Sequence, residues 1–258
     1  MRLMKRILSA AAVLALSASL LVGCSSGTAS SVPVSASSAA ESTVSSVEET
    51  ASSAVDENEA AAAQLLNDLT GSYQELWPVI LADEYKQTWL DDCTALVGED
   101  NAEAAFEKLS SMVTGDVYGE DAVKAYANGG GAYFCGFTNS LAILTFDGET
   151  STISGTDKDG NVLFSHTYHY IGMEPVRGLY EFQSDDADSG EFTYFVLAPD
   201  TSAETYHIEF RYGSDAEALS QYDTGEYAYW LASGISTDCD QTMIDNCIEL
   251  FCTENLAG

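Results

Sequence analysis

Between about residue 132 and residue 212, hydrophobic and polar positions alternate in short runs separated by turns rich in aspartate and glycine. In the run 161–171, Phe164, Tyr168 and Tyr170 share one face of an extended chain, because successive side chains of a strand point to opposite sides. Strands are predicted at residues 132–138, 141–147, 149–155, 161–171, 178–184, 191–198 and 205–212. Strands about 8 to 14 residues apart, joined by such turns, are typical of an antiparallel meander, sandwich or barrel.

Before this region the hydrophobic period is that of a helix. Gly71 and Pro78 interrupt the helical run, so it should form two or three helical pieces with a bend near Pro78. An aromatic stripe at this spacing is usually core, and this one is expected to cover or plug the sheet. Its members are Leu65, Leu66, Leu69, Tyr73, Trp77, Leu81, Tyr85 and Trp89.

Capping residues and the helical period predict four further helices. They cover residues 102–113 after an N-cap at Asn101, residues 120–127, a short helix that Ser214 caps and that ends at Leu219, and residues 240–251. The order of helices, strands and helices predicts a mainly β fold with flanking helices. The expected form is a small antiparallel barrel, or a strongly curved sheet, with helices at its mouth or ends.

The first residues have the three parts of a secretory signal peptide. Lys5 and Arg6 form a basic region, residues 7–21 are apolar but too few to span a membrane, and a small-residue cleavage site ends at Cys24. This Leu-Val-Gly-Cys site resembles a bacterial lipobox. The resemblance implies a signal peptide over residues 1–23, lipidation of Cys24 and an anchor on the outer side of a membrane in the cell envelope. The alternative is an ordinary secretory signal in which Cys24 is incidental.

Residues 24–55 are mostly serine, alanine, threonine, valine and glutamate, with no aromatic residue, lysine or arginine. Such a segment buries too little apolar surface to offset its chain entropy, so a disordered tether is expected. A flexible coil of about 30 residues spans on the order of 30 Å. Residues 56–258 then have a size typical of one domain.

The chain is strongly acidic, with nine lysine and arginine residues against 41 aspartate and glutamate residues and a formal net charge of −32. Three positive charges leave with the signal peptide, which brings the mature chain to about −35. Binding to nucleic acid is excluded, because it requires the opposite sign of charge. An acidic field raises the local concentration of cations, although most of these carboxylates also suit a solubility surface on an exported protein.

No motif indicates catalysis: the sequence has no nucleophile elbow, no H-E-x-x-H, no phosphate-binding loop and no dinucleotide fingerprint, so an enzyme is not expected. His166 and His169, three residues apart on one strand, should face opposite sides. The turn at Asp157 has some features of a calcium loop but lacks the remaining ligand positions, and a hairpin turn explains it. The acidic run 184–190 is expected to be a solvated loop.

Five cysteines occur besides Cys24. Export permits disulfides, but an odd number leaves at least one thiol unpaired, and the spacing does not indicate which residues would pair. A thiolate zinc site is disfavoured because no C-x-x-C is present. The five are Cys93, Cys135, Cys239, Cys247 and Cys252.

The sharpest chemical feature is His207-Ile-Glu209 in the predicted strand 205–212. Residues i and i+2 share a face and stand about 6 to 7 Å apart at their Cα atoms, a gap that a metal ion can bridge. Asp200, in the acidic turn upstream, is a third candidate ligand, and one histidine with two carboxylates suits zinc or a similar divalent ion. The alternative is a solvated polar face in which Glu209 pairs with Arg211 or a cross-strand partner. Tyr206, Ile208 and Phe210 are expected on the opposite, core-facing side.

Several stretches together resemble the ZinT type of zinc-binding protein, also called YodA. Residues 71–89 (GSYQELWPVILADEYKQTW) are similar to that family's opening helix, with its G-x-W/Y-x-x-x-x-P-x-L/I pattern. Residues 207–219 (HIEFRYGSDAEAL) are similar to its closing signature, an H-x-H strand followed by a glycine and a short helix, and residues 227–231 resemble the aromatic segment after it. The resemblance covers about residues 65–235. It implies a calycin-like, lipocalin-related barrel with helical additions that binds zinc.

The family holds its metal with a histidine in the turn before the last strand and with both histidines of H-x-H. Carried onto this chain, the first position of H-x-H is His207 and the second is Glu209. The turn histidine has no counterpart, with Asp200 the nearest candidate, and the family's histidine-rich N-terminal segment is absent.

Two functions follow from this resemblance. The first is an envelope-anchored protein that binds zinc or a similar divalent metal for acquisition or buffering, with a metal transporter as a candidate partner. The second is a domain of the same fold that has lost the metal and binds a small molecule or an envelope protein. Its site would be the barrel mouth, among Tyr168, Tyr170 and Trp230.

Overall fold

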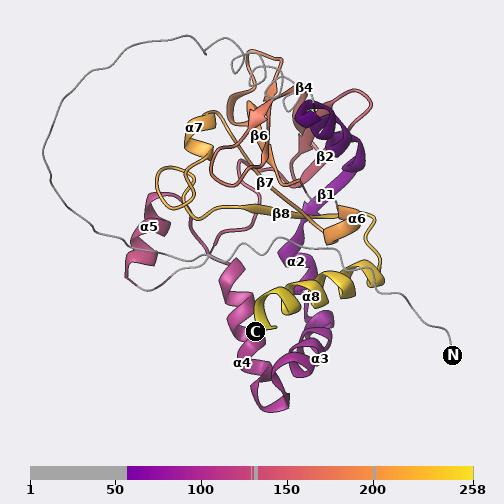
Figure 1. Ribbon diagram of the computed structural model, residues 1–258, viewed down its shortest axis with the longest axis vertical. Coiled ribbons are helices and arrows are strands. Elements are labelled where there is room, and N and C mark those ends of the chain that lie inside the picture. Colours follow the sequence, from indigo (N-terminus) through magenta and orange to yellow (C-terminus); the bar gives the residue numbers. More distant parts are fainter. Residues whose placement is uncertain (1–56, 129, 131–132, 200–201, 258) are drawn as a thin grey trace, which may run out of the picture. The chain divides into compact units, whose positions relative to one another are not determined.

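The computed structural model of the chain describes residues 57–128, 130, 133–199 and 202–257. In this part, eight strands close into one antiparallel barrel, in which each strand pairs with the next along the sequence and β8 returns to β1 (Figure 1). An eight-stranded up-and-down barrel is the lipocalin architecture, so the predicted calycin/lipocalin-like antiparallel barrel with helical additions is confirmed. The strands are β1 (Gly71–Glu75), β2 (Ile143–Asp147), β3 (Thr152–Thr156), β4 (Val162–Met173), β5 (Tyr180–Ser184), β6 (Tyr194–Leu197), β7 (Ile208–Gly213) and β8 (Ala232–Ser236).

The predicted strands from 141–147 to 205–212 correspond to β2–β7. The predicted strand 132–138 is wrong, since in its described part Phe134 makes only isolated bridges, to Thr114 and Trp230. Two strands that the hydrophobic pattern does not reveal complete the barrel instead. β1 lies inside the run that was predicted helical, and β8 has the small-residue sequence Ala-Ser-Gly-Ile-Ser. Tyr73 of β1 is aligned with Leu144 on one side and Ser236 on the other, so pairing with two strands overrides the helical spacing.

Aromatic rings fill the barrel interior. Phe195 of β6 is fully buried and lies against four other rings, with centroid distances between 5.4 and 6.4 Å to Phe164, Tyr168, Phe210 and Tyr212. Rings at such distances, tilted or offset, add to the stabilisation that comes from burial alone. The interior is therefore a packed core, unlike the ligand cavity of a lipocalin.

The helix over residues 57–68 covers one part of this core. Leu65 and Leu66 are buried in the same cluster as the barrel interior. The β2–β3 hairpin packs against this helix so closely that a Cβ on Gly148 would stand 2.4 Å from the Cα atom of Asn67. The start of the predicted apolar stripe thus does cover the sheet, and glycine in the Asp-Gly turn allows the approach.

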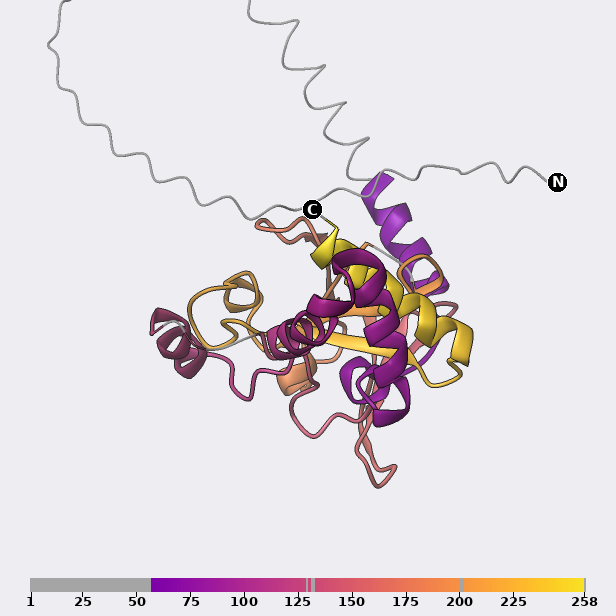
Figure 2. The ribbon, with the colours of Figure 1, turned by 90° about the horizontal axis from the view of Figure 1, so that it is seen from below.

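A second core lies outside the barrel, between β8 and the helices α2 (Leu76–Ile80), α3 (Lys86–Val97), α4 (Glu99–Val113) and α8 (Gln241–Leu256). Figure 2 shows these helices gathered over one end of the strands. Trp77, Trp89 and Phe251 meet ring to ring, and Trp89 Nε1 donates a hydrogen bond of 2.7 Å to the Ile80 carbonyl. Ile235 of β8 joins the cluster, so the barrel wall separates the two cores. We call this second core the helical layer.

The helix ends differ in detail from the predictions. Pro78 lies within α2, and the 3-10 helix η1 (Asp83–Tyr85) separates α2 from α3, so the run does break into short pieces. α4 begins at Glu99 after Gly98, and Asn101 is not its cap. Asp215, not Ser214, caps α7 (Ala216–Leu219). The helix α5 (Glu120–Ala127) is as predicted, α6 (Ser202–Thr205) is additional, and none of the described helices is long and apolar enough to cross a membrane.

Candidate functional site

The His207-Ile-Glu209 segment lies at the start of β7. Ile208, Phe210 and Tyr212 are buried in the barrel interior, whereas Glu209 is on the outer side. The predicted strand begins too early: residues 202–205 form α6, and Tyr206 has a φ of 64°. Tyr206 therefore does not share a face with Ile208 and packs partly against the helical layer. His207 is the residue at which the chain enters the strand.

The His207 ring is held in one orientation. Its Nδ1 lies 2.6 Å from the Thr205 carbonyl oxygen, and because a carbonyl only accepts, Nδ1 carries the proton. Nε2 then points toward Glu209, with 3.8 Å between Nε2 and Oε1. A histidine that ligates a metal is commonly held in this way, with its other nitrogen bonded to a carbonyl.

His207 and Glu209 face a small cavity of about 70 Å³ beneath α8. Leu76, Trp77 and Phe251 form its apolar walls, and α8 contributes Cys247 and Glu254. The side chain of His207 is 19% exposed and that of Glu209 44%, so the site is open to solvent on the Glu209 side. Cys247 is buried and lines the same cavity as His207. The site thus lies between barrel and helical layer.

The charges of the site stabilise one another. Burial by itself lowers the pKa of His207, but the neighbouring Cys247 and Glu209 side chains outweigh this and hold that pKa well above its usual 6.5. Burial raises the pKa of Glu209, and the nearby His207 imidazolium reverses this and lowers it below 4.5. A metal ion at Nε2 would have to displace this proton, because a ligating imidazole is neutral.

Sequence reasoning missed Cys247. The signal was present, since positions 247, 250 or 251, and 254 recur at helical spacing and place a thiol and a carboxylate on one face of α8. What the sequence lacks is any sign that this face of α8 lies on the outer side of β7.

Arg211 is not a partner of Glu209. Its side chain is fully buried, and its guanidinium donates to the carbonyl oxygens of Leu219, Gln221 and Tyr227. The ring of Tyr222 lies 4.3 Å from the guanidinium carbon. The proposed ion pair between Glu209 and Arg211 is therefore wrong, and Arg211 instead holds the segment that follows α7 against the barrel.

The two other histidines have carboxylate partners on the acidic loop. His166 Nδ1 lies 2.7 Å from Asp186, and His169 Nδ1 lies 2.6 Å from Asp185. The ring of His166 is mostly buried beside Phe164, whereas His169 is half exposed. The prediction of opposite faces is confirmed, but the run 184–190 is tied to β4 and is not simply solvated.

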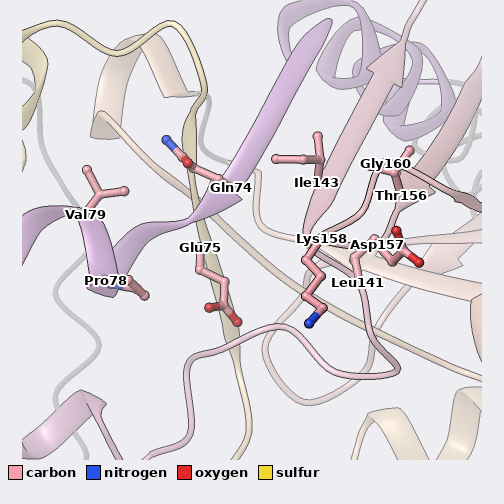
Figure 3. Close-up of a pocket in the computed structure, with 11 residues that line it drawn as sticks. Gln74, Glu75, Pro78, Val79, Leu141, Ile143, Thr156, Asp157, Lys158 and Gly160 are labelled. Carbon is pink, nitrogen blue, oxygen red and sulfur yellow. The ribbon is translucent and has the colours of Figure 1, made fainter.

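A larger groove, of about 500 Å³, lies beside the barrel where β1 ends and the β3–β4 turn begins. Glu75 and Lys158 lie on opposite sides of it (Figure 3). One Glu75 oxygen accepts a 2.5 Å hydrogen bond from the Phe137 backbone N–H. Asp157 accepts hydrogen bonds from Asp159 N, Asn161 N and Asn161 Nδ2, chiefly that of the Asn161 side chain, and these lower its pKa. Asp157 thus organises a turn, as the hairpin interpretation predicts.

The barrel mouth does not offer the aromatic site that the second hypothesis needs. Tyr168 is 2% exposed and donates to the Phe192 carbonyl, and Trp230 is fully buried with its N–H on the Gly136 carbonyl. Tyr170 packs against the barrel core. The prediction that these three side chains bind a ligand is therefore wrong.

Of the predicted metal ligands, the structure brings His207 and Glu209 together. Asp200 and Cys24 lie outside the described residues. Within the described part of the chain, no three histidine, cysteine, aspartate or glutamate side chains are already grouped to hold a metal ion. The separation of 3.8 Å between Nε2 and Oε1 is one that two ligands of a single zinc ion can have, because each ligand bond is about 2.0–2.2 Å. The described residues thus supply two donors of a site that needs at least one more.

No protein-family profile and no curated protein matches this chain. Among solved structures, the Zn(II)-bound ZinT-like domain of Streptococcus pneumoniae AdcA is similar, with a TM-score of 0.45 and 16% identity over 72% of this chain and 89% of that one. Zn(II)-bound AdcA from the same organism gives a TM-score of 0.42 and 15% identity over 70% of this chain, which spans 34% of that chain.

Proposed function

We propose that this domain binds one divalent metal ion of the zinc class at His207 and Glu209, with Asp200 as the third ligand. The observation that carries the proposal is the orientation of the His207 ring, whose Nδ1 is fixed on the Thr205 carbonyl so that Nε2 points toward Glu209. An imidazole and a carboxylate at 3.8 Å are suitable donors for zinc. Asp200 is two residues before α6 in the sequence.

The domain acts by binding and not by catalysis. In the described site the one candidate nucleophile, the thiol of Cys247, is buried. The cavity beside it has a volume of only about 70 Å³. Water and small ions fit such a space, whereas most organic substrates do not. A site with few donors, partly open to solvent, suits a protein that takes up a metal and releases it.

Equilibrium dialysis of the purified chain against zinc, followed by metal analysis, tests the proposal. We expect one zinc per chain in the wild type, none in His207→Ala, and affinity reduced at least about tenfold in Glu209→Gln. His169→Ala is the matched control, because it removes an exposed histidine that is paired with Asp185 and is not part of the site. The absence of bound zinc in the wild type at micromolar concentration would overturn the proposal.

The third ligand is tested by a second pair of variants. Asp200→Ala should weaken zinc binding as much as Glu209→Gln does, if Asp200 completes the site. Cys247→Ala separates this arrangement from one in which the thiol of α8 is the third donor. Loss of binding in Cys247→Ala with binding retained in Asp200→Ala would replace Asp200 by Cys247 in the assignment.

The setting of this function is also part of the proposal. We propose that Cys24 is lipidated and that residues 24–55 tether the domain to the outer side of a membrane in the bacterial cell envelope, where it buffers metal or supplies it to a transporter. The sequence pattern around Cys24 supports this placement. Metabolic labelling with a radioactive fatty acid should mark the wild type and not Cys24→Ser, and label retained in Cys24→Ser would refute lipidation at this residue.

A second candidate function rests on the groove of about 500 Å³. A carboxylate on one side and an ammonium group on the other suit a small molecule that carries both an amino and an acid group. Thermal unfolding in the presence of single amino acids tests this: the melting temperature should rise in the wild type and not in Lys158→Gln. An unchanged melting temperature with every amino acid would remove this candidate.

A further inference from the structure

Two buried thiols meet where α3 and α8 pack together in the helical layer. Cys93 of α3 and Cys252 of α8 are both fully buried, and their sulfur atoms are 3.9 Å apart. They are separated by 159 positions in the sequence. Both belong to the cluster that holds Trp77, Trp89 and Phe251, so the surrounding rings fix the two helices against one another.

The distance between these sulfur atoms is short enough for a covalent bond after a small rearrangement. A disulfide holds its sulfur atoms 2.03–2.05 Å apart, so the two must approach by about 1.9 Å in total. Rotation about χ1 moves each sulfur around its own Cα–Cβ axis, and the movement is shared between two side chains. The helices themselves need little displacement.

We propose that Cys93 and Cys252 form a disulfide that joins α3 to α8. The two thiols lose two protons and two electrons in total. An external disulfide, here called the disulfide donor, accepts them and is released as two thiols. One cysteine thiolate first attacks the donor to give a mixed disulfide, and the second cysteine then displaces the donor sulfur. The donor is a small-molecule disulfide or an oxidised thiol oxidoreductase, as found in the compartments outside the cytosol.

The reaction must take place before α8 has closed over α3. In the folded state, burial raises the pKa of both thiols, most strongly that of Cys252, so neither is a ready nucleophile there. Oxidation therefore accompanies folding or a local opening of α8. The bond then fixes the helix that carries Cys247 and the wall of the small cavity.

This inference does not depend on metal binding. It requires only a disulfide donor, which the proposed export of the chain supplies. Zinc dialysis and cysteine mapping therefore test separate proposals. A chain that binds no zinc can still carry the disulfide, and a chain without the disulfide can still bind zinc.

Peptide mapping tests the proposal directly. The purified full chain is refolded with oxidised and reduced glutathione, alkylated under denaturing conditions and digested without reduction. We expect one cross-linked peptide pair that contains Cys93 and Cys252, with Cys24, Cys135, Cys239 and Cys247 outside any cross-linked pair. The pair should be absent from Cys93→Ser and Cys252→Ser and present in Cys135→Ser, the matched control with a buried thiol elsewhere in the layer. Alkylation of both residues in the wild type, or pairing of either with another cysteine, would overturn the proposal.

Thermal unfolding gives a second measurement on proteins that fold. A bond that closes a loop of this length should raise the melting temperature by roughly 10 °C. A reductant should therefore lower the melting temperature of the oxidised wild type by that amount and leave the Cys93→Ser/Cys252→Ser double variant unchanged. An equal effect of the reductant on both would contradict the assignment.

Discussion

The barrel interior and the helical layer are both closed cores, yet they differ in chemistry. The barrel interior is aromatic, and the hydroxyl groups of Tyr168 and Tyr212 are bonded to backbone atoms. The helical layer contains four buried cysteines and borders the cavity that His207 and Glu209 face. In this barrel the space that lipocalins use for a ligand is filled with rings. The candidate chemistry therefore lies outside the barrel, between its wall and the helices.

The largest expected effect comes from breaking the barrel core. Phe195→Ala removes a ring that contacts four others in the interior, and should lower the free energy of unfolding by about 4 kcal/mol. Zinc affinity of the folded fraction should stay unchanged, because Phe195 does not line the site. Urea unfolding measures the loss, and Val162→Ala, at a side chain that is 70% exposed, is the control with little expected change. A small loss in Phe195→Ala would mean that the interior is not a packed core.

A smaller loss is expected where the helix 57–68 meets the β2–β3 hairpin. The methyl group of Gly148→Ala would stand 2.4 Å from the Asn67 Cα, so helix and hairpin must separate at a cost of about 2 kcal/mol. Gly130→Ala is the matched control, since its methyl group would meet only the Ala125 carbonyl oxygen at 3.6 Å. Equal urea midpoints for the two variants would show that the contact is not tight.

A third change weakens only the helical layer. Asp240 caps α8 by accepting a hydrogen bond of 2.9 Å from the Met243 N–H, and Asp240→Ala should cost about 1 kcal/mol in unfolding free energy. Asp240→Asn keeps an acceptor and should recover most of it. Because α8 carries Cys247, hydrogen exchange of α8 should rise in the alanine variant while β2–β7 keep their protection. Faster exchange across the barrel as well would show that the two cores unfold together.

The smallest effect is a pH dependence at the site itself. The pKa of His207 is raised above 6.5 in the folded chain, so its charged partners stabilise the fold fully below pH 6.5 and lose this contribution as pH rises through the folded value. Solvent screens the half-exposed Glu209, which keeps the effect below that of Asp240→Ala. In chelator, the stability difference between wild type and His207→Gln should shrink from pH 6 to pH 9. A difference that is constant or grows with pH would contradict the raised pKa.

Much of the fold could be predicted from local pattern. Alternation and Asp-Gly turns located β2–β7, and helical spacing located α8, because both signals depend on residues close in sequence. β1 could not be found in this way, since Tyr73 repeats at helical distance from Leu69 and Trp77 and only its pairing with two distant strands makes it extended. β8 contains small residues that show no alternation. Gly234 is aligned with Ile208 on β7, and a Cβ at position 234 would stand 3.1 Å from Ile208 Cγ1.

The sequence by itself determined an antiparallel sheet, either a small barrel or a strongly curved sheet, with flanking helices, and it marked His207 and Glu209 as two donors on one strand. Which groups surround those donors was decided only by tertiary structure. Arg211, two positions after Glu209, donates hydrogen bonds to three backbone carbonyl oxygens. Cys247, about 40 positions after His207, lines the same cavity as His207. Period and spacing report which face of an element is apolar. They do not report which distant helix covers that face, because this depends on how closed strands and packed helices fit together in space.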